Sequence, residues 1–164
     1  WIGRFAPEKR LDVALEAVRL ARRRGAQVEL TVAGGERPRG VNDSFIHFVG
    51  AVPHEQVVSL IDEAHATLLT SYGFDNQPMV ILESAARGRP TFVCDPVLGA
   101  EFGNAVVECA GSEASDLADT IVACAQNPGV LVDAGREASL LARQSSPQAH
   151  VKNLQGVIAG IRMR

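Results

Sequence analysis

A loop near the start of the sequence carries two cations that could hold a phosphate. Residues 3–9 read GRFAPEK, which places Arg4 and Lys9 between a short apolar segment and a longer amphipathic one. Arginine offers a planar fork to phosphate oxygens, and lysine offers a compact charge. Cations of this kind are equally common in solvated turns, so the pair alone leaves both interpretations open. If it is a binding loop, a diphosphate is the ligand that it suits.

A second loop carries two carboxylates at an unusual spacing. Residues 72–83 read YGFDNQPMVILE, with Asp75 in the polar part and Glu83 in the apolar part. Ionised carboxylates accept hydrogen bonds and do not donate them, so they suit hydroxyl groups rather than phosphate oxygens. The pair therefore predicts a ligand that carries hydroxyl groups.

The same stretch predicts the start of a helix. Gly73 permits backbone conformations that other residues resist, and Pro78 suits a first helical turn. The N–H groups of Met79 and Val80 would lie in that turn, where they have no intrahelical acceptor. Such helix ends bind anions, so a phosphate could be held between this end and the cations of residues 3–9.

These loops are positioned by a regular alternation of strands and helices. Strands are expected at residues 1–3, 28–34, 46–50, 66–70, 91–94 and 105–109, with a Gly-containing loop at 95–103. Helices are expected at residues 11–24, 53–63, 78–87, 115–126, about 130–143 and 147 to about 162. The strands are apolar without clean alternation, which is typical of parallel strands covered on both faces. The pattern predicts an α/β fold with a Rossmann-like, doubly wound parallel sheet, in which ligands bind beyond the carboxyl ends of the strands.

Composition limits the classes of partner. The chain has 164 residues, enough for one domain, and its net charge of −3 and pI of about 5.8 provide no basic field for nucleic acid. Three widely spaced cysteines indicate small buried side chains in a reducing compartment. No apolar run reaches the length of a membrane span. A cytoplasmic domain is expected, or one that associates with a membrane only through parts of the protein outside this segment.

Three segments taken together resemble a known family. They read GRFAPEKRLDVALEA, FVGAVPHEQVVSLIDEAHATLLTS and FDNQPMVILESAARGRPTFVCD. They are similar to the carboxyl-terminal, donor-binding half of retaining GT-B glycosyltransferases, the "glycosyl transferases group 1" family. The usual forms there are GR-x(n)-EKG, LG-x-V-x-x-(E)-L, and E-x7-E followed by EAMACGxPV. The resemblance covers most of the chain and keeps the order of the family.

The resemblance implies roles for particular residues. Cationic side chains would contact the diphosphate of a nucleotide sugar, the first acidic position would lie near the donor sugar, and the second would hold the ribose hydroxyls. The loop at residues 50–53 would lie against the base. The implied catalytic residues are Asp75, Arg4 and Lys9, and the implied donor-binding residues are Arg4, Lys9, Val52, Asp75, Asn76, Met79, Val80 and Glu83.

The sequence departs from the family pattern at several positions. Asp75 stands where the family usually has Glu, and an alternative alignment places Tyr72 there; Asp75 is preferred because it keeps seven residues before Glu83. Arg10 replaces the glycine that usually follows the lysine. Ser84 and Arg87 replace an alanine and a frequent cysteine.

The resemblance implies a hexosyltransferase-like enzyme that takes part in carbohydrate biosynthesis. It would move a sugar from a nucleotide-diphosphate donor to a hydroxyl acceptor, without a cofactor or metal. Because the sequence opens inside an expected strand at Trp1, residues 1–164 are interpreted as one donor-binding domain of a longer two-domain chain. The amino-terminal acceptor domain would be missing, and the isolated domain is expected to be inactive.

Two alternatives stay open at this point. One is a nucleotide-sugar epimerase or phosphorylase of similar architecture. The other is a non-catalytic nucleotide-binding or interaction module, for which the shortened carboxylate at Asp75 is the best argument.

Overall fold

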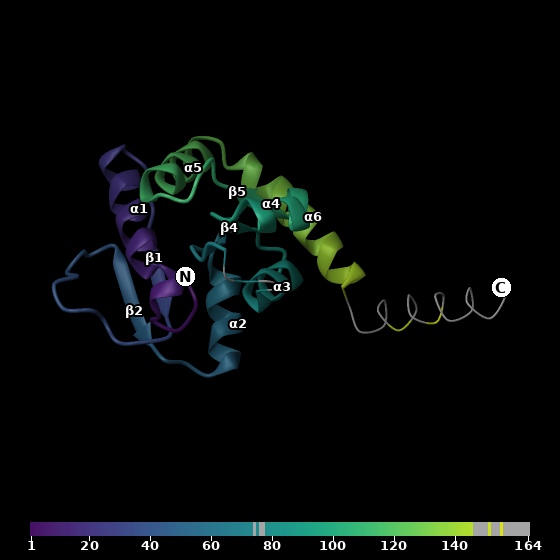
Figure 1. Cartoon of the computed structure of the whole chain (residues 1–164), viewed down its shortest axis with the longest axis horizontal. Coiled ribbons are helices and arrows are strands. Elements are labelled where there is room, and N and C mark those ends of the chain that lie inside the picture. Colours follow the sequence, from purple (N-terminus) through teal and green to yellow (C-terminus); the bar gives the residue numbers. More distant parts are fainter. Residues whose placement is uncertain (74, 76–77, 146–150, 152–154, 156–164) are drawn as a thin grey trace.

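Short parallel strands alternate with longer helices in the computed structural model of the chain (Figure 1). The structure describes residues 1–73, 75, 78–145, 151 and 155. The strands are β1 (Leu30–Ala33), β2 (Ile46–Gly50), β3 (Thr67–Leu69), β4 (Thr91–Val93) and β5 (Val106–Glu108). The α-helices are α1 (Leu11–Arg23), α2 (His54–Glu63), α3 (Met79–Ala86), α4 (Pro96–Phe102), α5 (Ala114–Gln126) and α6 (Gly129–Gln144). Two 3₁₀ turns, η1 (Pro7–Lys9) and η2 (Gly103–Ala105), complete the described elements.

All strand pairs in the described part of the chain are parallel, as expected for an α/β fold. β1 pairs with β2, and β4 lies between β3 and β5. Every residue of β3 and β4 is buried, which agrees with coverage on both faces. α1 and α5 pack against each other on one side of the strands, and α2 and α3 lie on the other side (Figure 1).

The described strands form two sheets rather than one. β1 and β2 make a two-stranded sheet, and β3, β4 and β5 make a three-stranded sheet. The first residues of the chain add a single isolated parallel bridge, from Ile2 to Ala33 of β1. Gly34 next to this bridge has a φ of +129°, and a Cβ there would lie 1.9 Å from the carbonyl oxygen of Gly3. A glycine is therefore required for the first residues to lie against β1.

The helix boundaries agree with the expected ones within one or two residues, except at residues 95–103. These residues were expected to form a loop, and that expectation is wrong because most of them form α4. Asp95 accepts a hydrogen bond from the Val97 amide and caps the helix, and Pro96 occupies its first turn. The helix expected at 147 to about 162 falls outside the described residues, apart from positions 151 and 155.

The main core lies between the strands and the α1–α5 pair. α1 buries one face, with Ala14, Ala17 and Ala21 fully enclosed. The expectation of buried cysteines is confirmed, since Cys94, Cys109 and Cys124 are unpaired and buried. Within the described residues, no helix is both long enough and apolar enough to cross a bilayer.

The amino group of Trp1 makes stability depend on pH when it is the free terminus. Burial lowers the pKa of this ammonium from 8.0 to about 5. Between these values the unfolded chain binds a proton that the folded chain does not, so stability rises with pH. We expect the free energy of unfolding to fall by up to about 4 kcal/mol as the pH drops from 8 to 5. Urea unfolding of this chain and of its amino-terminally acetylated form measures the effect. Equal pH dependence in the two forms would contradict it.

Candidate functional site

A buried hydroxyl at the carboxyl end of β3 holds the cationic loop. Thr70 is fully buried, and its Oγ1 accepts a hydrogen bond from the Trp1 indole nitrogen at 3.0 Å. The same hydroxyl donates to the carbonyl oxygen of Lys9 at 2.7 Å. One side chain therefore ties the first residues, β3 and the turn η1 together.

The backbone leaves η1 through a left-handed residue. Arg10 has φ 48° and ψ 48°, and it is the one non-glycine residue with positive φ in the described part of the chain. Left-handed geometry costs an L-residue about 1 kcal/mol, and glycine avoids this cost. This conformation explains why glycine is usual after the lysine in the motif that Arg10 interrupts. The Arg10 guanidinium lies 3.7 Å from the Glu113 carboxylate.

The two loops that were singled out in the sequence meet at a salt bridge. Lys9 Nζ donates to both carboxylate oxygens of Asp75, at 2.7 and 2.9 Å. The side chains are 19% and 13% exposed, so the pair is largely removed from water. The pairing places Asp75 beside the cation that was expected to meet a diphosphate. Tyr72, the alternative at the acidic position, is 52% exposed.

Asp95 holds the start of the loop that carries Asp75, here called the acidic loop (residues 72–78). It is only 4% exposed and accepts a hydrogen bond from the Gly73 amide at 2.6 Å as well as the one from Val97 at 2.9 Å. β3 and β4 are parallel neighbours, so the residues that follow them emerge at the same edge. In the sequence, Asp95 was only the first residue of an expected loop. Its position directly after an expected strand was the available signal.

The helix after the acidic loop begins where anion binding was expected. Pro78 is the N-cap of α3 rather than its first residue, and Met79 and Val80 open the helix. In the described part of the loop, no side chain caps this end. Asp75 precedes Met79 by four residues, so their Cα atoms are at most about 14 Å apart.

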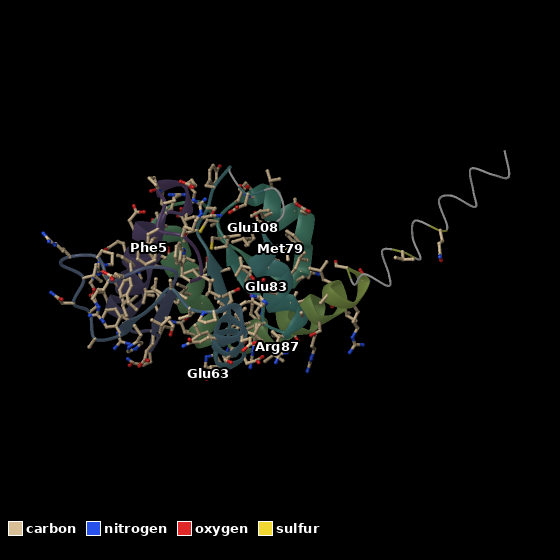
Figure 2. All side chains as sticks on the ribbon, turned by 90° about the horizontal axis from the view of Figure 1, so that it is seen from below. Phe5, Glu63, Met79, Glu83, Arg87 and Glu108 are labelled. Carbon is tan, nitrogen blue, oxygen red and sulfur yellow. The ribbon has the colours of Figure 1, made fainter. Side chains whose placement is uncertain are left out.

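Glu83 lies one helical turn beyond Met79 and faces the loop after β2. Figure 2 shows Met79, Glu83 and Arg87 in succession along α3. A Glu83 carboxylate oxygen lies 3.9 Å from His54 Nδ1, at the start of α2. The half-buried Val52 precedes His54 by two residues, so the loop expected to meet the base adjoins the second carboxylate.

Some residues that were expected to bind the donor do not contact the Lys9–Asp75 pair. Arg4 is 79% exposed and lies 3.6 Å from Glu8 on its own loop. Asn76 lies outside the described residues. At the far end of α3, Arg87 pairs with Asp62 of α2, away from the strand ends.

Comparison with known proteins identifies the family of the chain and its fold. The profile of the family described as "Glycosyl transferases group 1" matches residues 1–127. No curated protein sequence matches the chain.

Solved structures show the same fold at low identity. HepE from Anabaena, solved with UDP and glucose, has a TM-score of 0.75 at 16% identity, over 97% of this chain and 47% of its own. TarM has a TM-score of 0.75 at 16% identity, over 95% of this chain and 34% of its own. Sucrose-phosphate synthase from Thermosynechococcus elongatus has a TM-score of 0.70 at 18% identity, over 98% and 44%. The chain thus spans less than half the length of these neighbours.

Asp95 should stabilise the acidic loop and α4 together. Asp95→Ala removes the acceptor of two amides in a buried place, and we expect a loss of about 1–3 kcal/mol in the free energy of unfolding. Urea denaturation measures the loss. Glu101→Ala, on the exposed face of the same helix, is the control and should change stability by less than about 0.5 kcal/mol. Equal effects of the two substitutions would mean that the two hydrogen bonds contribute little.

Proposed function

We propose that this chain, which belongs to the "Glycosyl transferases group 1" family, is the donor-binding domain of a retaining glycosyltransferase. The sugar would pass from a nucleotide diphosphate to a hydroxyl acceptor. The observation that carries the proposal is the Lys9–Asp75 pair, which brings a cation and a carboxylate together at the strand ends. The GT-B fold shared with HepE, which was solved with UDP and glucose, supports it.

In this proposal the diphosphate is held by cations and by a helix end. Lys9 is held by Asp75 and by the Thr70 bridge, whereas the side chain of Arg4 is mostly exposed and pairs with Glu8 on its own loop. The first-turn amides of Met79 and Val80 complete the set. Charge develops on the departing diphosphate during transfer, and positive groups already in place lower the barrier. These groups would do the work of a metal ion, so no metal is proposed.

In this proposal, each of the two carboxylates binds a different part of the donor. Asp75, next to the phosphate-binding lysine, would accept hydrogen bonds from the sugar hydroxyls. Glu83, next to His54 and close along the chain to Val52, would accept them from the ribose, and the loop containing Val52 would lie against the base. The acceptor hydroxyl would be presented by a part of the protein outside this segment. The isolated chain should therefore bind the donor weakly and transfer no sugar.

Arg4 should contribute to phosphate affinity without contributing to stability. Arg4→Ala is expected to weaken binding of nucleoside diphosphates by about 1.5–3 kcal/mol, the worth of a charge-assisted hydrogen bond. Titration calorimetry with a panel of nucleoside diphosphates measures it. Arg136→Ala is the matched control, because Arg136 is similarly exposed and also pairs within its own segment. Unchanged affinity in Arg4→Ala would remove this residue from the site.

Asp75 and Glu83 should be distinguishable by the part of the donor that each binds. Glu83→Gln should weaken nucleoside diphosphate and intact nucleotide sugar alike, whereas Asp75→Asn should act mainly on the intact donor and, in the whole protein, on turnover. The ratio of the two dissociation constants, from calorimetry, is the readout.

Asp43→Asn controls for the loss of an ion pair. Asp43 is 20% exposed and makes a bidentate pair with Arg19, much like Asp75 with Lys9. Asp43→Asn should lower stability and leave the ratio unchanged. If Asp75→Asn weakens both ligands equally, Asp75 has no sugar-specific role. A chain that binds no nucleoside diphosphate in preference to other anions would instead be a non-catalytic module.

A further inference from the structure

Two of the cysteines lie side by side at the carboxyl ends of β4 and β5. Val93 and Glu108 are partners in the parallel ladder, and the Cys109 amide donates to the Val93 carbonyl at 2.9 Å. Cys94 and Cys109 are the next residues along the two strands, so the same register places them opposite each other. The fold therefore pairs two thiols that the sequence keeps apart.

Both side chains lie on the same face of the sheet. Cys94 and Cys109 belong to the core next to α1 and α5, whereas Val93 and Val106 belong to a second apolar cluster. The two cysteines are 1% and 5% exposed. Neighbouring strands lie about 4.7–4.9 Å apart, within the Cα separation of about 4.4–6.8 Å that a disulfide spans. A disulfide between them therefore requires little movement of the backbone.

The two thiols differ in how readily they ionise. A hydrogen bond from Cys109 lowers the pKa of Cys94, and the charge of Arg10 acts in the same direction, against burial and Asp116. The same contact and burial raise the pKa of Cys109, and a hydrogen bond from Thr120 offsets part of this rise. Thiolates are the nucleophiles in cysteine chemistry, so Cys94 is suited to attack an oxidant and Cys109 to complete the bridge.

The pair lies next to loops of the candidate site. Asp95, which holds the acidic loop and caps α4, directly follows Cys94. Cys109 begins the segment that leads to Glu113, whose carboxylate lies 3.7 Å from the Arg10 guanidinium. A covalent link between the two cysteines would therefore join the strand that positions Asp95 to the end of β5.

We propose that Cys94 and Cys109 form an oxidation site, at which a peroxide converts two thiols to a disulfide that ties the carboxyl ends of β4 and β5 together. Since both thiols are buried, a small uncharged oxidant such as hydrogen peroxide is the suitable one. Thiol reductants would reverse the change.

The reaction takes place in two steps. The Cys94 thiolate attacks one peroxide oxygen, the O–O bond breaks, and the departing hydroxide takes up the proton that Cys94 released and leaves as water. The Cys109 sulfur then attacks the sulfur of the Cys94 sulfenic acid. The S–O bond breaks, and the second hydroxide leaves as water with the proton of Cys109. The two thiols together lose two electrons, and one hydrogen peroxide is reduced to two waters.

Treatment of the folded chain with hydrogen peroxide tests the proposal. Cleavage after Glu101 and Glu113 places Cys94, Cys109 and Cys124 on three different peptides. We expect the Cys94 and Cys109 peptides to be joined, the mass of the chain to fall by about two daltons, and dithiothreitol to reverse both changes. Cys124 should remain a free thiol. Treatment in urea, where the register is lost, should give a mixture of pairings.

Several results would overturn the proposal. They are a different pairing in the folded chain, two thiols that stay reduced, and separate oxidation of the two cysteines without a bridge. The same preference in urea as in the folded chain would also count against it, because the fold would then play no part.

Single serine variants test the order of the two steps. Cys109→Ser should abolish the mass loss and leave a sulfenic acid on Cys94, which dimedone labels. We expect at least about tenfold more label there than on Cys109 in Cys94→Ser. Equal labelling would contradict the assigned order. Cys124→Ser is the matched control and should form the bridge as fully as the unaltered chain does.

Thermal unfolding of Cys124→Ser tests whether the bridge ties the strand ends in their native arrangement. The oxidised form should melt several degrees above the reduced form, because the bridge restricts the unfolded chain. An equal or lower melting temperature would mean that the strand ends must distort to form the bridge, and this part of the proposal would be wrong. Melting of the other two variants, measured alongside, shows that each is folded when it is labelled.

Discussion

The hydroxyl of Thr70 is the contact on which the candidate site depends. It is fully buried, it accepts from the Trp1 indole, and it donates to the Lys9 backbone. Without a hydroxyl at this position, two buried polar groups would lose their partner, and the loop that carries the cations would have no fixed relation to β3. The same bridge spans the junction between the two sheets, because Trp1 lies against β1 while Thr70 follows β3.

Lys9 and Asp75 illustrate how a fold brings together two residues that lie far apart in the sequence. They are 66 residues apart, and each is more than four-fifths buried in the folded chain. A carboxylate in this position holds the ammonium in place, while the backbone of the lysine is held by Thr70. The strained conformation of Arg10 directly after Lys9 shows that the turn is set by its surroundings rather than by local preference.

The loop between β3 and α3 is held from two strands at once. Asp95 follows β4, yet its carboxylate binds the amide of Gly73 after β3 and also caps α4. Parallel neighbours bring their carboxyl ends to one edge of the sheet, so each loop can brace the next one. This explains why a capping residue can matter to an amide 22 residues away.

The sequence by itself determined the alternation of strands and helices and the loops that matter. The signals for them are local: apolar segments without alternation, glycine and proline stops, and the spacing of Asp75 from Glu83. Local signals can be recognised in the sequence without knowledge of the tertiary structure. It could not separate a helix from a loop at residues 95–103, because the start signal of Asp95 followed by Pro96 stands beside two glycines, Gly99 and Gly103. Nor could it pair Lys9 with Asp75, place His54 beside Glu83, or divide the strands between two sheets. These outcomes depend on which strands lie next to each other, and only the packing of the whole chain decides that.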